Sequence, residues 1–239
     1  MATSHKKPPH FSQRRLKIRK RRIKRAEELL KARYGAQIKR IPAFRVSEGV
    51  KEVKRKVAKL CSEKEVVVVL VCGPQGSGKT KLTSRLAKDL NAGLIHTDAY
   101  YKPFEVVDGL TLYFDDPRAV DYEQMVRDIK NWKLGKDIEM PVHDPVSHKQ
   151  AGTKKIPHRK VLFVEGIMAF HPELIKLADL RVYVEASPSK RLKRRLRRDV
   201  RERGRTVQYV KDRFYSTIER ARLRFLERWK PKADLIIIT

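Results

Sequence analysis

The segment Gly73–Thr80, with the sequence GPQGSGKT, constrains the fold of this chain more than any other feature. The apolar, mostly β-branched run Val66–Val71 comes directly before it and is typical of a buried parallel strand. Leu82, Leu86 and Leu90 follow at helical spacing, so the segment is a glycine-rich turn between a strand and a helix. Such a turn aims backbone N–H groups and the positive end of a helix dipole at one point, where a polyphosphate can bind.

The same pattern predicts roles for individual residues of the turn. We expect Lys79 to reach the β- and γ-phosphates of a nucleoside triphosphate, and the Thr80 hydroxyl to bind Mg²⁺. ATP or GTP together with Mg²⁺ is therefore the expected cofactor. The predicted nucleotide-binding set is Gly73, Gln75, Gly76, Ser77, Gly78, Lys79 and Thr80.

The size and the apolar pattern favour one globular domain without a membrane segment. The chain has 239 residues, 41% of them hydrophobic, enough for one sizeable core. Its longest apolar run, Val66–Cys72, is far shorter than the roughly 18–20 residues of a transmembrane helix, and no signal-peptide pattern follows the basic N-terminus. Cys61 and Cys72 fall at apolar positions, which argues against a disulfide framework or a zinc site. We therefore expect a cytoplasmic protein that makes no membrane contact.

The formal net charge of +29 is unusual for a soluble enzyme and indicates an anionic partner. Residues 1–60 carry 21 Lys and Arg against four Asp and Glu, and residues 190–228 carry 16 against five. Residues 1–26 hold eleven basic side chains, no acidic one and only two serines, although an organellar targeting peptide would be rich in serine. We predict a basic N-terminal arm over residues 1–46, disordered when free, and a P-loop domain over residues 47–239.

Short apolar runs alternate with helical patterns along the rest of the chain. Strands are predicted at residues 66–71, 94–97, 161–164, 180–185 and 234–238, and helices from Ser47 and over residues 121–134, 188–203 and 206–229. Residues 140–155 show no regular pattern. Alternating strands and helices predict an α/β fold with a parallel sheet covered on both faces, the three-layer fold of P-loop NTPases.

Two carboxylates follow predicted buried strands. Asp98 comes directly after the strand at 94–97, and Glu165 directly after the strand at 161–164. Because the carboxyl ends of parallel strands meet at one edge of a sheet, we expect both near the phosphate turn, where they could bind Mg²⁺ together with Thr80. Asp98 is also the candidate general base that takes the proton of an acceptor hydroxyl, although a turn or helix-capping aspartate would give the same pattern.

The predicted helix at 188–203 is the candidate lid over the phosphates. Leu192, Leu196 and Val200 recur every fourth residue and predict an anchored face. Guanidinium groups on the other faces can grip phosphate oxygens through two hydrogen bonds each, although a solvated charged helix is the alternative. The candidate lid residues are Arg194, Arg195, Arg198, Arg203 and Arg205.

A family resemblance rests on blocks that occur in a fixed order. The blocks are His96–Tyr101, Tyr113–Asp121, Leu134–Pro141, Val146–His148, Val164–Ile167 and Arg198–Arg205. Together they resemble the uridine kinase branch of the phosphoribulokinase/uridine kinase family, from about residue 65 to the C-terminus. The resemblance implies a nucleoside monophosphate kinase-like fold with an arginine-rich helical lid. It also implies transfer of the γ-phosphate of ATP or GTP to a sugar 5′-hydroxyl.

The resemblance further implies roles for single residues. The predicted catalytic set is Lys79 of the phosphate turn, Asp98 as general base and Arg198 as a lid arginine. Arg203 is a second lid arginine that is expected to contact the nucleotide. The implied substrate-binding residues are Asp98, Tyr101 in the acceptor pocket, Phe114 against the pyrimidine, Asp115 and Arg195 at the ribose hydroxyls, His148 at the base edge, and Arg205 from the lid. The metal set stays Thr80, Asp98 and Glu165.

Three features depart from the family pattern. His143-Asp144-Pro145 stands where a tyrosine usually precedes Asp-Phe, and Arg213-Phe214 stands where the family has glutamine and tyrosine. The basic arm also lies outside the family's core. We place His143 in the acceptor pocket and expect altered recognition of the base. Two alternatives stay open: an RNA-associated P-loop kinase or ATPase whose arm docks on RNA, and a kinase of another sugar or sugar phosphate. The sequence is also compatible with a homo-oligomer.

Overall fold

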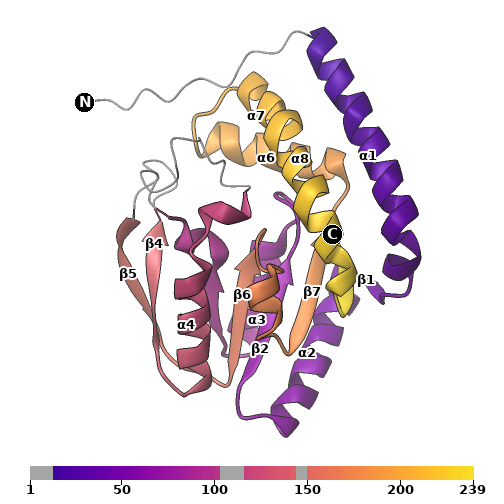
Figure 1. Cartoon of the computed structure of the whole chain (residues 1–239). Coiled ribbons are helices and arrows are strands. Elements are labelled where there is room, and N and C mark those ends of the chain that lie inside the picture. Colours follow the sequence, from indigo (N-terminus) through magenta and orange to yellow (C-terminus); the bar gives the residue numbers. More distant parts are fainter. Residues whose placement is uncertain (1–12, 103–115, 144–149) are drawn as a thin grey trace.

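A six-stranded sheet, in which all neighbouring strands are parallel, forms the centre of the protein (Figure 1). The computed structural model describes residues 13–102, 116–143 and 150–239. In spatial order the strands are β1 (Ala43–Arg45), β8 (Leu235–Ile238), β7 (Leu180–Glu185), β2 (Val67–Cys72), β6 (Val161–Gly166) and β3 (Gly93–His96). The five strands predicted from the sequence all lie in this sheet. Its most buried strands are β2, which is apolar throughout, and β6, which is apolar as far as Val164 and then ends in Glu165 and Gly166. Long apolar runs are expected of strands in a sheet that is covered on both faces.

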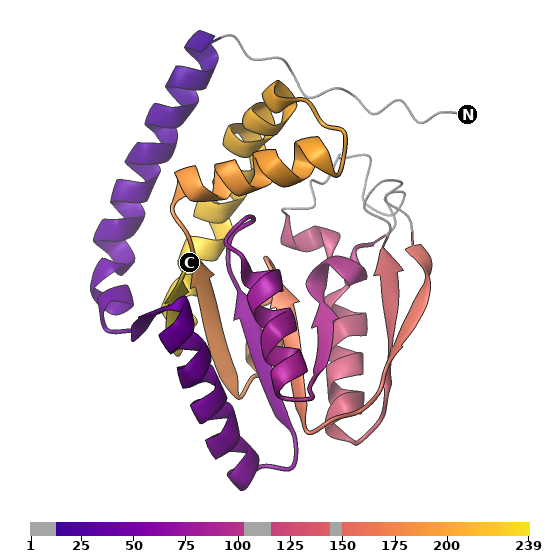
Figure 2. The same ribbon diagram turned by 180° about the vertical axis from the view of Figure 1, so that it is seen from behind.

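Helices pack on both faces of the sheet and complete the predicted three-layer fold. The helices on the two faces are α2 (Val46–Glu63) and α3 (Lys79–Asp89) on one, and α4 (Tyr122–Lys133) and α5 (Pro172–Ile175) on the other (Figures 1 and 2). Successive side chains of a strand point to opposite faces, so Val69 packs among residues of α2 and α3, while Leu70 packs on the α4 side. Asp121 caps α4 by accepting a hydrogen bond of 2.9 Å from the Gln124 backbone N–H.

The helices of the predicted lid lie at the end of the sheet where the phosphate turn is found. Helix α6 (Pro188–Arg201) runs across this end, close to the turn (Figure 2). It is followed by a continuous helical segment built from α7 (Val207–Arg213), η4 (Phe214–Ile218), α8 (Glu219–Ala221), η5 (Arg222–Leu226), α9 (Glu227–Trp229) and η6 (Lys230–Lys232). The stretches η4 and η5 are π-helical, and the segment leads directly into the closing strand β8.

Residues 140–155, predicted to be irregular, instead contain both strands of an antiparallel hairpin. Strands β4 (Ile138–His143) and β5 (Gln150–Ile156) pair with each other and lie outside the main sheet. The burial of Ile138 opposite Ile156 closes one end of the hairpin onto the core. The prediction was wrong because β5 is exposed from Gln150 to Lys155 and therefore shows no alternation of apolar and polar residues.

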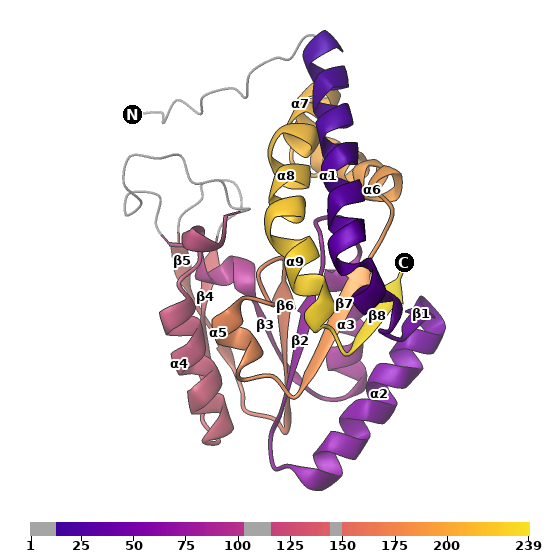
Figure 3. The same ribbon diagram turned by 45° about the vertical axis from the view of Figure 1, so that its right-hand side comes forward.

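The expected disordered arm is also wrong over the residues that the structure describes. Helix α1 (Gln13–Lys39) lies along α8 and α9 (Figure 3), and β1 adds a sixth strand beside β8. Leu16, Ile23 and Leu30, each seven residues apart, are half-buried on the inner side of α1, and Ile38 packs on the core. The helix was not predicted because basic side chains occupy many of the positions between the apolar residues of this stripe. Residues 1–12 lie outside the described residues, and a boundary near residue 47 stays a prediction.

Two further expectations concern membranes and cysteines. Across residues 13–102, 116–143 and 150–239, no helix is both long and apolar enough to cross a bilayer. Cys61 and Cys72 are both free. Burial raises the pKa of the Cys72 thiol to about 12, so this side chain stays protonated and packs as an apolar group.

A test of the core packing uses Gly93, at the start of β3. A Cβ atom here would lie 2.8 Å from Cζ2 of the fully buried Trp132, a contact that requires the ring to move. We expect Gly93→Ala to lower the free energy of unfolding by about 1–3 kcal/mol, measured by urea denaturation. The control Gly35→Ala, which meets only Lys31 at 3.7 Å, should leave stability equal or higher. Equal stability of the two variants would contradict this packing.

Candidate active site

The phosphate turn has the backbone shape that its glycines predict. Gly76 and Gly78 have φ angles of +78° and +92°, a region that side chains other than glycine rarely adopt. Gly78 is the N-cap of α3 and makes no side-chain cap, so the first N–H groups of this helix are directed at the turn. A Cβ atom on Gly76 would lie 2.8 Å from the backbone oxygen of Arg191. The glycine therefore also permits the close approach of α6.

The turn opens onto a cavity of about 610 Å³ that brings together most of the predicted site. Its lining includes Gln75, Gly76, Gly78, Lys79, Thr80, Asp98, Tyr101, His143, Glu165, Arg195, Arg198, Arg203 and Arg205. Gly73 and Ser77 of the predicted set are buried in the turn itself. Phe114, Asp115 and His148 lie outside the described residues. The elements that supply the lining are the carboxyl ends of β3 and β6, the hairpin, and α6 with the segment after it.

Glu165 lies at the end of β6, 5% exposed, and points into the cavity beside the turn. Its Oε1 accepts hydrogen bonds from Thr80 Oγ1 at 3.1 Å and from His96 Nδ1 at 2.9 Å. Burial raises the pKa of Glu165, but the His96 hydrogen bond and the positive charge of Lys79 outweigh it, so the pKa lies below the usual value. Glu165 is therefore ionised at neutral pH and can bind a cation.

The donor set fits a magnesium ion of the kind that binds with a nucleotide. Oε2 of Glu165 is buried and has no hydrogen-bond partner among the described residues, and the Thr80 hydroxyl lies directly beside Oε1. The described residues contain no cluster of three or more His, Cys, Asp and Glu that could hold a metal ion. Mg²⁺ does not need one, since it keeps several waters and binds through one or two carboxylates plus substrate phosphates.

Asp98 also lines the cavity, from the 3-10 helix η1 (Thr97–Tyr100) that follows β3. Its Oδ1 accepts hydrogen bonds from Tyr101 Oη at 3.3 Å and from Thr97 Oγ1 at 3.4 Å. The carboxylate itself is exposed to the cavity, whereas the Tyr101 ring is buried and meets His143 edge-on with the ring centres 5.4 Å apart. Asp98 is thus oriented by neighbours and accessible to an acceptor.

The most buried row of α6 is polar rather than apolar. Arg191, Arg195 and Asp199 recur every fourth residue and are 1%, 5% and 3% exposed, whereas the predicted anchor stripe at Leu192, Leu196 and Val200 is only half-buried. The predicted face was therefore wrong. Burying charged groups in this way requires partners for each of them.

Asp199 is the partner for three lid arginines. It forms ion pairs with Arg195 at 2.7 Å, Arg198 at 2.8 Å and Arg203 at 3.7 Å. Burial lowers the pKa of Arg203, and the neighbouring charge of Arg198 lowers it further. One buried carboxylate therefore positions several guanidinium groups around the cavity. Arg195 also donates to Oε1 of Gln75, which ties the lid to the phosphate turn.

A second contact between lid and turn comes from Arg194. Its Nη1 donates to the backbone oxygens of Gly76 at 3.1 Å and Ser77 at 3.0 Å, and to Thr239 Oγ1 at 2.8 Å. Arg194 therefore binds the backbone of the turn and the C-terminal Thr239 while it also lines the cavity.

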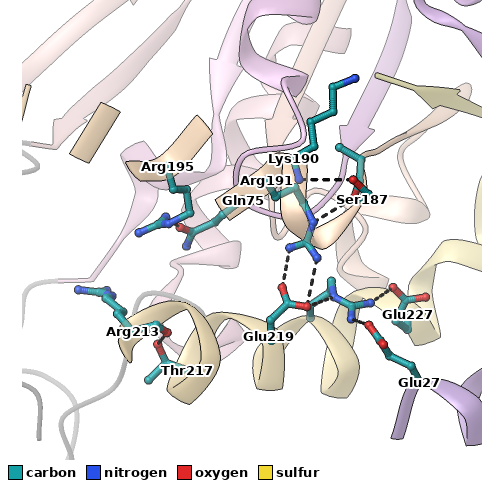
Figure 4. A network of polar contacts seen from close by, with 12 residues as sticks. Glu27, Gln75, Ser187, Lys190, Arg191, Arg195, Arg213, Thr217, Glu219 and Glu227 are labelled. Atoms are coloured by element: carbon teal, nitrogen blue, oxygen red, sulfur yellow. Dashed lines mark hydrogen bonds and ion pairs between the residues drawn. The ribbon is translucent and has the colours of Figure 1, made fainter. Parts of the chain in front are cut away.

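Arg191 anchors α6 to the long helical segment through a buried ion pair. Its guanidinium donates two hydrogen bonds to Glu219, at 2.6 and 3.1 Å, and both side chains are 1% exposed (Figure 4). Glu219 also accepts from Arg222 at 3.0 Å, and Arg222 reaches Glu227 and Glu27 of α1. Burial lowers the pKa of Arg222, but these three carboxylates raise it above its usual value.

Several cavity residues were not assigned a role from the sequence. His96 orients Glu165, Asp199 holds the lid arginines, and Lys154 comes from the hairpin that was not predicted. The four-residue spacing of Asp199 from Arg195 and Arg203 was a usable signal. Lys154 carried no signal, because nothing local says that an exposed lysine faces a cavity formed by distant elements.

Comparison with protein families identifies a known group. Residues 68–239 match the family model described as the phosphoribulokinase/uridine kinase family. A uridine kinase from Macrococcus caseolyticus is 34% identical over 183 residues, covering 72% of this chain and 88% of that protein. A uridine kinase from Borreliella burgdorferi is 37% identical over 175 residues, covering 71% and 85%.

Solved structures show the same fold at low sequence identity. A protein assigned as a fructose transport system kinase from Silicibacter sp. TM1040 aligns with a TM-score of 0.65 at 18% identity, covering 81% of this chain and 98% of that one. A circularly permuted protein from Saccharomyces cerevisiae assigned as a P-loop kinase, YFH7, aligns with a TM-score of 0.63 at 11% identity, covering 82% and 99%. These likenesses confirm the α/β P-loop fold.

The buried ion pair gives a stability prediction. Glu219→Gln should leave the guanidinium of Arg191 buried without a charged partner and lower the free energy of unfolding by about 3–5 kcal/mol. Urea denaturation measures the change. The control Glu123→Gln breaks an exposed pair with Arg127 and should cost less than about 0.5 kcal/mol. A loss below about 1 kcal/mol in Glu219→Gln would show that the pair does not hold α6 in place.

Proposed function

Because the chain belongs to the phosphoribulokinase/uridine kinase family, we propose that it transfers the γ-phosphate of ATP or GTP to a hydroxyl of a pyrimidine nucleoside. Membership of this family was predicted from the sequence blocks, and it makes the chain a kinase, a phosphotransferase that acts on an alcohol group. The observation that carries the proposal is the single cavity onto which the phosphate turn and Asp98 both open. Donor and acceptor groups would meet there.

The donor side is formed by the turn and the lid. The N–H groups at the start of α3 and the Lys79 ammonium would bind the phosphates, and Arg198 and Arg203 would reach them from α6 and the turn that follows it. Thr80 and Glu165 would hold Mg²⁺, with Asp98 as a further candidate ligand. When bound, this ion neutralises charge on the β- and γ-phosphates. Phosphoryl transfer needs mainly such positioning and charge, so the protein itself forms no covalent bond to the phosphate.

The acceptor side is formed by Asp98 and its neighbours. Asp98 would accept the proton of the attacking hydroxyl, which makes the oxygen a better nucleophile as the bond to phosphorus forms. The Tyr101 hydroxyl, 3.3 Å from Asp98, keeps the carboxylate directed into the cavity. Tyr101 and His143 offer aromatic surface for the acceptor, and Arg195 and Arg205 line the same cavity. Roles for Phe114, Asp115 and His148 stay predictions from the family resemblance.

A second candidate is an acceptor that carries its own phosphate. The described lining of the cavity contains eight Lys and Arg against three Asp and Glu. Lys154 and Arg213 add positive charge to this lining from the hairpin and from α7. The donor phosphates would take up part of this charge, and an acceptor with a phosphate of its own, such as a sugar phosphate or a nucleotide unit within RNA, would offset more of it than a neutral nucleoside.

A transfer screen with [γ-³²P]ATP and [γ-³²P]GTP distinguishes these acceptors. Uridine, cytidine, other nucleosides, free sugars, sugar phosphates and total RNA are offered in parallel at equal acceptor concentration. Label on uridine or cytidine supports the proposal. Label confined to sugar phosphates or RNA supports the second candidate, and label on none of the acceptors overturns both.

A lysine substitution tests the donor site. Lys79→Ala should lower the turnover of phosphate transfer by at least about 100-fold, because it removes the ammonium group that would stabilise negative charge on the β- and γ-phosphates during transfer. Initial rates with labelled nucleotide measure the loss. The matched control is Lys81→Ala, two residues further along α3 on an exposed position, which should keep the parental rate. Unchanged turnover in Lys79→Ala would remove the turn as the donor site.

An aspartate substitution tests the base. Asp98→Asn should lower turnover by about 10²–10⁴-fold and leave the nucleotide dissociation constant nearly unchanged, because the amide keeps the shape but accepts no proton. Steady-state rates and calorimetric titration measure the two quantities. Asp137→Asn, at an exposed aspartate outside the cavity, is the matched control. A loss of turnover below about tenfold would exclude Asp98 as the general base.

A further inference from the structure

The N-terminal half of α1 presents a dense basic face that the kinase reaction does not use. Between residues 14 and 25, eight Lys and Arg side chains are exposed and no acidic residue occurs. At a rise of about 1.5 Å per residue, this stretch is about 17 Å long. We call the exposed Lys and Arg of residues 14–25 the α1 basic face. None of its residues lines the cavity in the part of the chain that the structure describes.

The stretch of α1 that carries the basic face has no acidic side chain of its own. Glu27 and Glu28, the acidic side chains of α1, occur only after residue 25, and Glu27 is paired with Arg222. The body of the protein contacts the inner side of these turns: burial and the charge of Arg220 lower the pKa of Arg19, and Asp212 offsets part of this effect. Lys20 packs over the ring of Tyr215, with Nζ 4.9 Å from the ring centre. The exposed Lys and Arg, among them Lys17, Arg21, Lys24 and Arg25, are directed at solvent, where an external anion can reach them.

The position of the face connects it to the active site. The residues that α1 meets, Asp212 and Tyr215, belong to the helical segment whose other residues Tyr209 and Arg213 line the cavity. The N-terminal half of α1 stands beside this segment at the end of the molecule that carries α6 (Figures 1 and 3). A long anion bound to α1 would therefore lie beside the helical segment that also lines the cavity.

From this charge and position, we propose that the α1 basic face docks the phosphate backbone of RNA. A nucleic-acid strand carries a charge about every 3.4 Å, so about five phosphates fit along the face. A lipid surface fits less well, because Ile18 is the one large apolar side chain with an exposed surface among residues 14–25. The choice of RNA over DNA rests on the proposed function, since the cavity would then accept a ribonucleoside unit.

The test removes charge from the face without touching the cavity. The variant carries Lys17→Gln, Arg21→Gln, Lys24→Gln and Arg25→Gln, all at exposed positions. The matched control removes the same charge elsewhere, with Lys51→Gln, Lys88→Gln, Lys133→Gln and Lys136→Gln on exposed parts of α2, α3, α4 and the turn after it. Glutamine keeps a long, helix-compatible side chain, and thermal unfolding checks that both proteins fold.

Binding is measured by fluorescence anisotropy with a single-stranded RNA of about 20 nucleotides, a DNA of the same sequence, and vesicles of phosphatidylcholine and phosphatidylserine. Between about 50 and 300 mM salt, the slope of log K against log salt should become shallower by about 3 in the α1 variant, since four phosphate contacts are lost. Its RNA affinity at about 100 mM salt should fall at least tenfold. The control variant should bind like the parent.

Several outcomes would overturn the docking proposal. They are equal losses in the two variants, no RNA binding by the parent at micromolar concentration, or tighter parental binding to DNA or vesicles than to RNA. The proposed kinase function is read separately, from label transfer to uridine, which the α1 variant should perform at the parental rate. Failure of that transfer in the parent would remove the proposed function and leave the RNA-binding result standing.

Discussion

The buried pair of Arg191 and Glu219 is the interaction on which the arrangement of the site depends. Arg191 lies at the point where the backbone of α6 approaches Gly76, so the residue that fixes the lid helix also sets its distance from the phosphate turn. A guanidinium that is 1% exposed cannot shift without losing its partner, because an unpaired buried charge is costly. The ion pair therefore holds α6 in one position relative to the long helical segment. Gly76 of the turn has no side chain and therefore leaves space for the backbone of α6 at this point.

The polar row of α6 explains how a strongly basic helix can be buried at all. Arg195 and Asp199 continue the row that Arg191 begins, and Asp199 gathers Arg198 and Arg203 around a single carboxylate. The most deeply buried side chains of this helix make hydrogen bonds and ion pairs, while its apolar side chains are only half-buried. Hydrogen bonds from guanidinium groups are directional, which suits a helix that must hold several of these groups in defined directions.

The sequence predicted those parts of the fold that local patterns determine. The parallel sheet, the phosphate turn and the position of Glu165 follow from apolar strands and a motif of fixed geometry, and the structure places Asp98 in the same cavity as Lys79. Parts that depend on distant partners were missed. Helix α1 is held by an ion pair to Arg222 and by Ile38 against the core, and neither is visible from a count of charges. The hairpin was missed because β5 is exposed and shows no alternation of apolar and polar residues.

Positive side chains repel one another both in the cavity and on α1, but this repulsion is reduced in different ways at the two places. In the cavity, Asp199 offsets part of the repulsion, and the lowered pKa of Arg203 shows that crowding by Arg198 and burial persist. A bound polyphosphate would relieve that repulsion and thereby stabilise the lid, as any ligand stabilises the state that binds it. On α1 the stretch over residues 14–25 has no acidic side chain of its own, and water and salt screen its exposed charge. Exposed charge of this kind contributes little to folding, so its concentration on one helix is explained better by recognition of an anion than by stability.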